Sequence, residues 1–221
     1  MSKSEPALVL YYHPFASYCQ KVLAALYESG TPFHPHLVDL GDEAARNAFY
    51  AIWPIGKFPV LRDPPRGVTI PESTTIIEYL DLHHPGAARL LPADAEDAWR
   101  VRARDRFFDS YIHEPMQKIV GDRLRPPGSK DAAGVDTARK TLATAYGLLE
   151  QELATAAWAR KDGFDLADCA AAPALFYADW VQPFRGAHPH LAAYFERLLA
   201  RPSFARVVEE AKPYRGLFPK G

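Results

Sequence analysis

The stretch GKFPVLRDPPRGVTIPES, residues 56–73, decides the fold of the first half of the chain. Pro59 opens an apolar run, and the start of a strand is one of the few places where a β-sheet tolerates proline. The turn letters DPPRG separate a strand pattern over Phe58–Arg62 from a second one over Val68–Ile70. A helical pattern, Ser73–His83, follows at once. The stretch therefore predicts a β-hairpin followed by a helix.

Two strand and helix pairs precede this hairpin. Ala7–Tyr12 is a compact apolar run that suits a buried strand, and Ser17–Ser29 carries its apolar residues on one face of a helix. Phe33–Leu40 predicts a second strand and Glu43–Tyr50 a short helix. The resulting order, βαβαββα, is the plan of the thioredoxin fold. In that plan the first two strands are parallel and the hairpin supplies the antiparallel edge.

We assign residues 1–85 to this α/β domain and residues 86–95, which contain glycine and proline, to a linker. Residues 96–221 show no convincing strand pattern and are expected to form an all-α helical domain. The helical patterns extend over Ala95–Val120, Asp131–Thr155, Leu166–Trp180, Pro189–Ala200 and Ser203–Ala211.

The composition excludes several classes of protein. With 48% hydrophobic and 24% charged residues, the 221-residue chain matches ordinary globular proteins, and its net charge of -1 predicts no nucleic-acid partner. No apolar run approaches the roughly 20 residues of a membrane-spanning helix, so we expect no membrane partner and a cytoplasmic protein. Two cysteines are too few for a disulfide framework. The eight histidines lack supporting ligands, so no metal is expected.

This organisation resembles the cytosolic glutathione transferase family, in particular its bacterial serine/cysteine-type branch, and the likeness covers nearly the whole chain. The resemblance implies a cis peptide bond before Pro59, and a Phe58 backbone that pairs with glutathione as an extended peptide. It also implies that Glu72 and Ser73, with Ser73 as a helix cap, hold the γ-glutamyl end of glutathione. Lys57 is expected to meet the glycine carboxylate. Glutathione would act as co-substrate, with no metal.

The segment DLADCAAAPAL, residues 165–175, is a further family-like feature. Asp165 is a candidate helix cap, and Asp168 can close a capping box from the fourth position. The family places Ser or Thr at the first position, so Asp165 is a departure that sets two carboxylates near each other. This motif supports folding rather than chemistry, and Cys169 within it is expected in the core.

The segment YYHPFASYCQKV, residues 11–22, surrounds the expected thiol site. The glutathione thiol has a pKa of about 8.5 and attacks as the thiolate. A hydroxyl donor near a helix N-terminus would stabilise that anion, and lowering the pKa by two units takes roughly 2.7 kcal/mol. Ser17 is the favoured donor, although a second way of counting places the family's serine position on Ala16. Tyr12 and Tyr18 are further candidates.

A cysteine close to Ser17 raises a second possibility. Cys19 is either a redox thiol or, more simply, a small apolar residue of the first helical turn. If it were the reactive group, the protein would belong with glutathione-dependent thiol reductases or peroxidases. That chemistry needs a cysteine at the donor position, where the sequence has Ser17 or Ala16.

The resemblance also implies a hydrophobic acceptor site between the first strand–helix turn and the first long helix of the second domain. Its candidate residues are Phe15, Phe108, Tyr111 and Met116. At helical spacing, such residues more often belong to the core than to a pocket, and His113 lies among them without an assigned role.

Three functions therefore remain open. The first is a glutathione transferase that adds the thiolate to a small hydrophobic electrophile, with Ser17 as catalytic residue. The second is the thiol reductase or peroxidase, and the third a non-catalytic interaction protein on the same scaffold. Members of the last kind tend to lose the glutathione-binding residues, whereas Pro59, Glu72 and Ser73 are all present. The resemblance further implies a homodimer.

Overall fold

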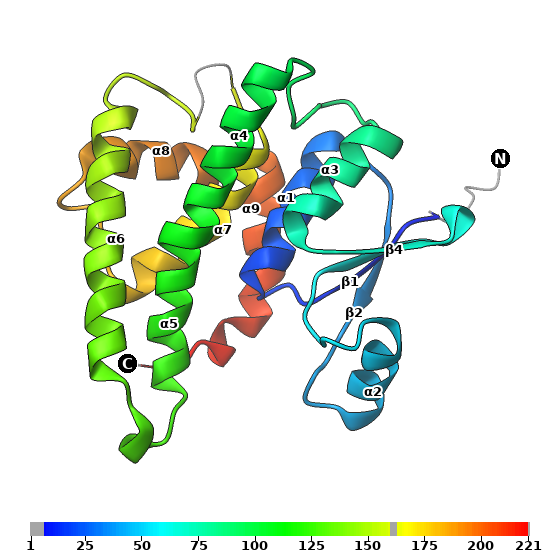
Figure 1. The fold of residues 1–221 in the computed structure, drawn as a ribbon, viewed down its shortest axis with the longest axis horizontal. Coiled ribbons are helices and arrows are strands. Elements are labelled where there is room, and N and C mark those ends of the chain that lie inside the picture. Colours follow the sequence, from blue (N-terminus) through cyan, green and yellow to red (C-terminus); the bar gives the residue numbers. More distant parts are fainter. Residues whose placement is uncertain (1–6, 160–162, 221) are drawn as a thin grey trace.

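The computed structural model describes residues 7–159 and 163–220, and it has the two-part organisation that the sequence predicts (Figure 1). The first part is an α/β domain whose elements follow the order βαβαββα. A turn of 3-10 helix, Pro64–Arg66, joins the last two strands. The elements are β1 (Val9–Tyr12), α1 (Ser17–Ser29), β2 (His34–Leu37), α2 (Glu43–Ile52), β3 (Val60–Asp63), β4 (Val68–Pro71) and α3 (Ser73–His83).

The sheet has the strand order β2-β1-β3-β4. β1 is parallel to β2, with Val9 opposite His34, and antiparallel to β3, with Leu10 opposite Leu61. β3 and β4 form the antiparallel hairpin. The predicted thioredoxin-like topology is therefore confirmed. β2 is shorter than predicted and exposed along its length, because it is an edge strand, where Pro35 is tolerated.

Every element of regular secondary structure in the described residues of the second part is helical, as predicted. Two short 3-10 segments, Pro127–Ser129 and Lys212–Leu217, lie between or after its helices. The helices are α4 (Ala95–Phe107), α5 (Glu114–Arg123), α6 (Ala132–Leu153), α7 (Leu166–Val181), α8 (Pro189–Ala200) and α9 (Pro202–Ala211), with the π-helical segment η2 (Phe108–His113) between α4 and α5.

The predicted single helix over 95–120 is thus interrupted by η2. Pro115 has no backbone N–H to donate to the carbonyl of Tyr111, four residues earlier, and its ring would crowd that carbonyl in a regular α-helix. The wider π-helical turn relieves both conflicts, and such turns are frequent at functional sites. It turns His113 into the interior, where the side chain is 2% exposed.

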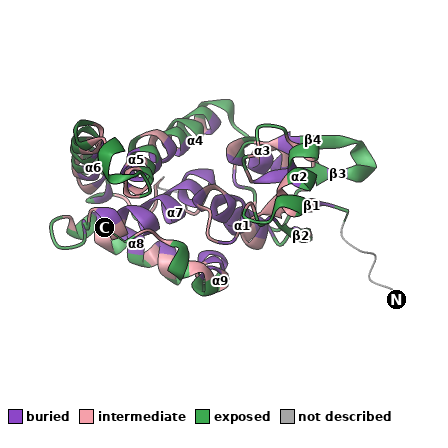
Figure 2. Ribbon diagram, turned by 90° about the horizontal axis from the view of Figure 1, so that it is seen from below, coloured by how far each residue is buried: buried purple, intermediate pink, exposed green. Residues whose placement is uncertain are grey.

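The buried helix α7 forms the centre of the helical domain (Figure 2). The predicted capping box is confirmed, because the Asp165 side chain accepts from the Ala167 N–H and Asp168 accepts from the Asp165 N–H. Asp168 also accepts the Tyr194 hydroxyl at 2.6 Å. Burial and the Asp165 charge raise the pKa of Asp168 to about 7.

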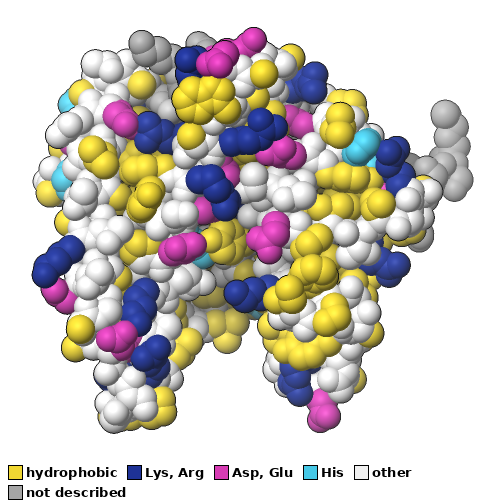
Figure 3. Space-filling view, in the orientation of Figure 1, with side chains coloured by type: hydrophobic (Ala, Val, Ile, Leu, Met, Phe, Trp, Pro, Cys, Tyr) yellow, Lys and Arg dark blue, Asp and Glu magenta, His cyan; other side chains and the backbone are white. Residues whose placement is uncertain are grey.

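The two parts share a packed interface through α1. This helix contacts α3 on its own side and α7 and α9 of the helical domain on the other. Below this interface the surface is hollowed, between the lower ends of α5 and α6 on one side and the region of α2 on the other (Figure 3). Across the described residues, the structure contains no helix with the length and apolar character needed to span a membrane.

Candidate active site

Two adjoining cavities open where the two domains meet. The first, which we call the polar cavity, has a volume of about 470 Å³, and the second, the apolar cavity, about 440 Å³. Tyr18, Lys57 and Phe58 line both. A molecule that occupies the polar cavity and places a reactive atom at these shared residues would present it to a second molecule in the apolar cavity.

The polar cavity is built on the stretch that decides the fold. The Phe58–Pro59 peptide bond is cis, and β3 begins only at Val60. The backbone of Phe58 therefore lies ahead of the paired strand, at the cavity wall, where an extended peptide can reach its N–H and C=O. The exposed Lys57 lies next to it and lines the same cavity, where its ammonium group can meet a carboxylate of such a peptide.

The N-terminus of α3 supplies the anion-binding end of the same cavity. Ser73 was expected to cap α3, but it is the first residue of the helix, and Glu72 is the cap residue. Glu72 makes no side-chain cap hydrogen bond. The first N–H groups of α3 are thus available, together with the positive end of the helix dipole, to a carboxylate in the cavity.

The backbone of Glu72 has φ = 67° and ψ = 121°, and among the described residues it is the one non-glycine residue with positive φ. A residue with a side chain pays roughly 1–3 kcal/mol for such a conformation. Strain of this kind clusters at functional sites, and Glu72 lines the polar cavity.

A buried ion cluster contacts the first turn of α3 and connects it to the helical domain. Lys21 of α1 is 1% exposed and lies 2.6 Å from Asp105 Oδ1 and 2.8 Å from Asp109 Oδ2. Its Nζ also donates to Thr74 Oγ1, and Thr74 donates to Asp105 Oδ2. Arg106 pairs with Asp109 and donates to Thr74. The second residue of α3, directly after Ser73, is thereby tied to the helical domain.

The structure distinguishes the candidate hydroxyl donors of the thiol site. Ala16 is the cap residue of α1, with no side-chain cap hydrogen bond, and Ser17 is its first residue. Both line the apolar cavity beside the shared residues. Ser17 Oγ is buried and has no hydrogen-bond partner within the described part of the chain. The hydrogen-bonding capacity of this hydroxyl, at the N-terminus of α1, is therefore unused within the described part of the chain.

The two tyrosine candidates lie differently. Tyr12 lines neither cavity. Tyr18 lines both, and burial and the charge of Asp109 raise the pKa of its phenol. Tyr18 therefore remains protonated around neutral pH. Besides Ser17, it is a further candidate donor, at the junction where the two cavities share Tyr18, Lys57 and Phe58.

The cysteines do not offer a reactive thiol. Cys19 is fully buried, and burial raises its pKa, although its Sγ accepts the His13 N–H at 3.5 Å. Cys169 is also fully buried, with a raised pKa. Neither forms a thiolate around neutral pH. Among the residues that the structure describes, no group of three or more potential ligands is arranged to hold a metal ion.

The predicted acceptor residues divide into two pairs. Phe15 and Met116 line the apolar cavity. Phe108 is 0% exposed and borders a different cavity, near Trp158, because the π-helical segment turns it into the core. Tyr111 is 53% exposed and faces a groove beside α6. We therefore leave Phe108 and Tyr111 out of the acceptor site.

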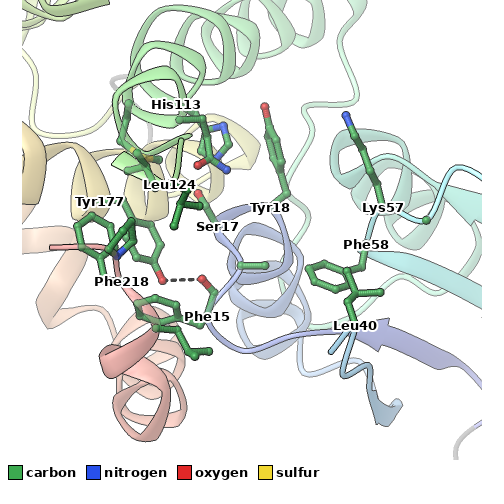
Figure 4. Close-up of a pocket in the computed structure, with 17 residues that line it drawn as sticks. Phe15, Ser17, Tyr18, Leu40, Lys57, Phe58, His113, Leu124, Tyr177 and Phe218 are labelled. Atoms are coloured by element: carbon green, nitrogen blue, oxygen red, sulfur yellow. Dashed lines mark hydrogen bonds between the residues drawn. The ribbon is translucent and has the colours of Figure 1, made fainter. Parts of the chain in front are cut away.

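Sequence reasoning missed the wall that the C-terminal segment and α7 provide. In Figure 4, Phe15, Tyr177 and Phe218 lie on one side of the apolar cavity and Phe58 and Leu40 on the other. The Tyr177 hydroxyl donates to the Phe15 carbonyl at 2.9 Å, and the rings of Tyr177 and Phe218 stack at 6.1 Å. These residues are about 160 and 200 positions from the thiol site, so no local pattern indicates their role.

Comparison with known proteins shows the family to which the chain belongs. A family model described as glutathione S-transferase, N-terminal domain, matches residues 10–88, and one described as glutathione S-transferase, C-terminal domain, matches residues 107–202. Together with the α/β and helical domains described above, these matches define the class. The chain belongs to the glutathione S-transferase family.

Individual relatives span nearly the whole chain. Glutathione S-transferase 3 of Zea mays is 31% identical over 91% of this chain and 93% of its own, and GstB of Escherichia coli K12 is 28% identical over 86% and 91%. A solved glutathione S-transferase of Methylobacillus flagellatus with glutathione bound superposes with a TM-score of 0.82, at 27% identity, over 90% of this chain and 98% of its own.

Proposed function

We propose that the protein is a glutathione transferase that adds the glutathione thiolate to small hydrophobic electrophiles. The observation that carries this proposal is the meeting of the two cavities at Tyr18, Lys57 and Phe58, beside the unpaired hydroxyl of Ser17. A peptide ligand fits the polar cavity and an apolar acceptor fits the other. Family membership and the glutathione that is bound in the Methylobacillus flagellatus structure support the same reading.

The chemistry of the walls of the polar cavity supports binding of glutathione there. Its γ-glutamyl carboxylate takes the N–H groups at the start of α3 and the Ser73 hydroxyl, and its ammonium group faces Glu72. The cysteinyl backbone pairs with Phe58, and the glycine carboxylate reaches Lys57. The sulfur then lies at the junction, with the electrophile held in the apolar cavity by Phe15, Met116 and the aromatic wall.

Ser17 stabilises the thiolate in this arrangement. Its buried Oγ, which costs about 1–3 kcal/mol while unpaired, gains a charged acceptor when the sulfur ionises. A hydrogen bond from a neutral donor to a charged acceptor is worth about 1.5–3 kcal/mol, which is of the size needed to lower the thiol pKa by one to two units. Thiolate attack on the electrophilic carbon then forms the thioether bond.

The alternatives are less well supported. A thiol reductase or peroxidase needs a reactive cysteine, whereas Cys19 is buried with a raised pKa. A purely non-catalytic protein has no use for a strained Glu72 and an unpaired Ser17 hydroxyl at one ligand-sized junction.

Steady-state kinetics with glutathione and benzyl chloride test the proposal. At pH 6.5, Ser17→Ala should lower kcat/KM by roughly 10–100-fold, which corresponds to the loss of one hydrogen bond to the thiolate. Ser129→Ala, a change at an exposed residue of the segment Pro127–Ser129, is the matched control and should leave kcat/KM unchanged. No conjugation by the parent protein would contradict the proposal.

We further propose a cytoplasmic homodimer. A groove of about 570 Å³ beside α6 is lined by Phe107, Tyr111 and Leu148. Ile55 and Tyr50 of the α/β domain are 66% and 42% exposed. Apolar surface on each domain of one chain can cover the complementary surface of a second copy.

A further inference from the structure

The turn that joins β1 to α1, residues 13–16, is bound by two buried side chains that lie outside it. Gln20 of α1 is 0% exposed, and its Nε2 donates to the Pro14 carbonyl at 2.9 Å. Tyr177 of α7 is 3% exposed, and its hydroxyl donates to the Phe15 carbonyl at 2.9 Å (Figure 4). Two successive carbonyl groups of the β1–α1 turn therefore depend on these side chains.

The direction of these hydrogen bonds follows from the chemistry of the groups. A carbonyl only accepts, so the end of the Gln20 amide that faces Pro14 is the NH2 group. The same Nε2 lies 3.0 Å from the Tyr177 oxygen, to which its other N–H donates. The phenol then has its single hydrogen for the Phe15 carbonyl, and because burial raises the pKa of Tyr177, that hydrogen stays in place around neutral pH. Gln20 therefore orients the hydroxyl that Tyr177 presents to the turn.

The bond from Tyr177 differs in kind from the bonds within the turn. The Ala16 N–H donates to the His13 carbonyl, and the Phe15 N–H donates to His13 Nδ1. These two bonds close the turn on itself. The bond from Tyr177 instead connects the turn to the helical domain, across 162 positions of sequence. The position of the turn relative to α7 therefore depends on this contact.

The orientation of Ser17 follows from that of the turn. The Phe15 carbonyl belongs to the planar peptide group that joins Phe15 to Ala16, so its hydrogen bond orients that plane. Ala16 is the cap residue of α1, and Ser17 is the first residue of the helix. A rotation of the plane would change the direction in which α1 begins and would displace Ser17 Oγ. Hydrogen bonds weaken steeply when donor and acceptor are misaligned, and a displacement of 1 Å can cost about 100-fold in rate.

We propose that Tyr177 is a positioning residue for the thiol site. Its hydroxyl, oriented by Gln20, holds the β1–α1 turn in the geometry in which Ser17 stabilises the glutathione thiolate. This inference rests on the proposed transferase function, because it requires glutathione in the polar cavity with its sulfur near Ser17. The hydroxyl of Tyr177 is committed to the turn, so it acts on the sulfur through Ser17 and not by contact.

The first test is the pKa of the bound thiol in the full-length parent and in Tyr177→Phe. This variant loses the hydroxyl but keeps the ring, which meets the Phe15 ring edge-on at 5.4 Å. The ultraviolet absorbance of the thiolate, followed against pH in the complex with glutathione, reports the pKa. We expect a pKa about one unit higher in Tyr177→Phe, which corresponds to roughly 10-fold weaker stabilisation of the thiolate.

The pH profile of turnover should move by the same amount. At saturating glutathione, kcat/KM for benzyl chloride should fall roughly 5- to 10-fold in Tyr177→Phe at pH 6.5. The difference should nearly vanish at about pH 9, where the thiol is ionised in both proteins. A loss of activity that is equal at all pH values would overturn the proposal, because it would show a change other than in the ionisation of the thiol.

Tyr146→Phe is the matched control. Tyr146 of α6 is also buried, and its hydroxyl donates to the Gln182 carbonyl at 3.2 Å. It lines neither the polar nor the apolar cavity. Both variants lose one phenol hydroxyl that donates to a backbone carbonyl, so both should lower the urea midpoint of unfolding. Only Tyr177→Phe should shift the pKa of the bound thiol.

S-methylglutathione separates binding from ionisation, because its sulfur carries no proton. By calorimetry it should bind the parent and Tyr177→Phe equally, since Tyr177 does not line the polar cavity. An unchanged thiol pKa in Tyr177→Phe, or an equal shift in Tyr146→Phe, would overturn the positioning role. A parent that does not bind glutathione, or binds it without ionising the thiol near neutral pH, refutes the proposed function itself, so the two failures are distinguishable.

Discussion

Ser17 and Ala16 occupy the two positions that the sequence left open for the hydroxyl donor, and their places in α1 differ. Ala16 is the cap residue and Ser17 the first helical residue, with a buried hydroxyl at the apolar cavity. A one-residue ambiguity at a helix start cannot be resolved from periodicity, because helix boundaries are the least certain part of a pattern. The structure also argues against Tyr12 as the hydroxyl donor, because Tyr12 lines neither cavity. The catalytic role of Ser17 itself stays a prediction.

The backbone conformation of Glu72 is a second feature of a single residue that the sequence does not predict. The letters TIPES predict a helix start correctly, but they contain no sign that Glu72 rather than Ser73 is the cap residue, or that its φ is positive. Glycine usually occupies such a backbone position, and a glutamate there runs against local preference. Local rules fail most often at functional sites, so this failure itself marks the site.

His113 gives a prediction for the pH dependence of stability. In the unfolded chain the imidazole pKa is about 6.5, whereas in the folded chain it is lowered to about 3. The unfolded state therefore binds the proton first, and this group's contribution to stability is lost as pH falls from 6.5 toward 3. Between pH 7 and pH 4, protonation of this group should lower the free energy of unfolding by about 3 kcal/mol.

Urea unfolding of the parent and His113→Phe at the two pH values measures this contribution. The phenylalanine variant should lose about 3 kcal/mol less stability on acidification than the parent, because it has no group to protonate there. The comparison cancels the carboxylates common to both proteins. Equal losses in the two proteins would show that His113 is protonated, or hydrated, in the folded state.

At the scale of elements, the βαβαββα order and most helical patterns of the second domain are confirmed, because most of these elements have a clear hydrophobic period. The π-helical turn over 108–113 was not predicted. Periodicity alone predicts one helix through Pro115, and the change of register that this proline favours moves Phe108 into the core and Tyr111 to the surface. This single turn explains why Phe108 and Tyr111, which were predicted as acceptor residues, do not line the apolar cavity.

The Lys21 cluster joins four elements, α1, α3, α4 and η2, and its prediction belongs at this scale. Lys21→Met removes the cation that α1 contributes to Asp105 and Asp109, which are both nearly inaccessible to solvent. Breaking a buried ion pair on one side costs about 3–5 kcal/mol. We expect a loss of this size in the free energy of unfolding, measured with urea. Because Thr74 loses its tie to Lys21, glutathione affinity should also fall.

Lys140→Met is the matched control for this change. Lys140 is 77% exposed and pairs with Asp136 on the surface of α6, so its loss should leave the free energy of unfolding nearly unchanged. A destabilisation by Lys21→Met that is no larger than that of Lys140→Met would contradict the account of the cluster.

At the scale of the whole molecule, the sequence predicted the two-part plan but not how the parts meet. The domain limits at 85 and 96 stay predictions. The aromatic wall of the apolar cavity brings Tyr177 of α7 and Phe218 of the C-terminal segment to Phe15, and only the packing of α1 against α7 and α9 creates this contact. Contacts between residues so distant in sequence have no local signature, which is why the composition of the acceptor site could not be predicted in full.

The proposed homodimer is a further prediction at this scale. In sedimentation velocity, the parent should have twice the chain mass of 24.6 kDa. Tyr111→Asp places a charge in the apolar groove beside α6 and should shift the protein toward monomer. Leu124→Asp, at a residue that is 71% exposed outside that groove, should not. A monomeric parent would contradict the proposal.

The central claim is that Ser17 stabilises a glutathione thiolate where the two cavities meet. Calorimetric titration of glutathione into the parent and Ser17→Ala, at pH 7 in buffers of different ionisation enthalpy, measures the protons released on binding. The account predicts that the parent releases a large fraction of one proton, because the bound thiol ionises, and that Ser17→Ala binds glutathione with much less release. Equal proton release by both proteins would contradict it and would leave Tyr18 as the hydroxyl at the junction.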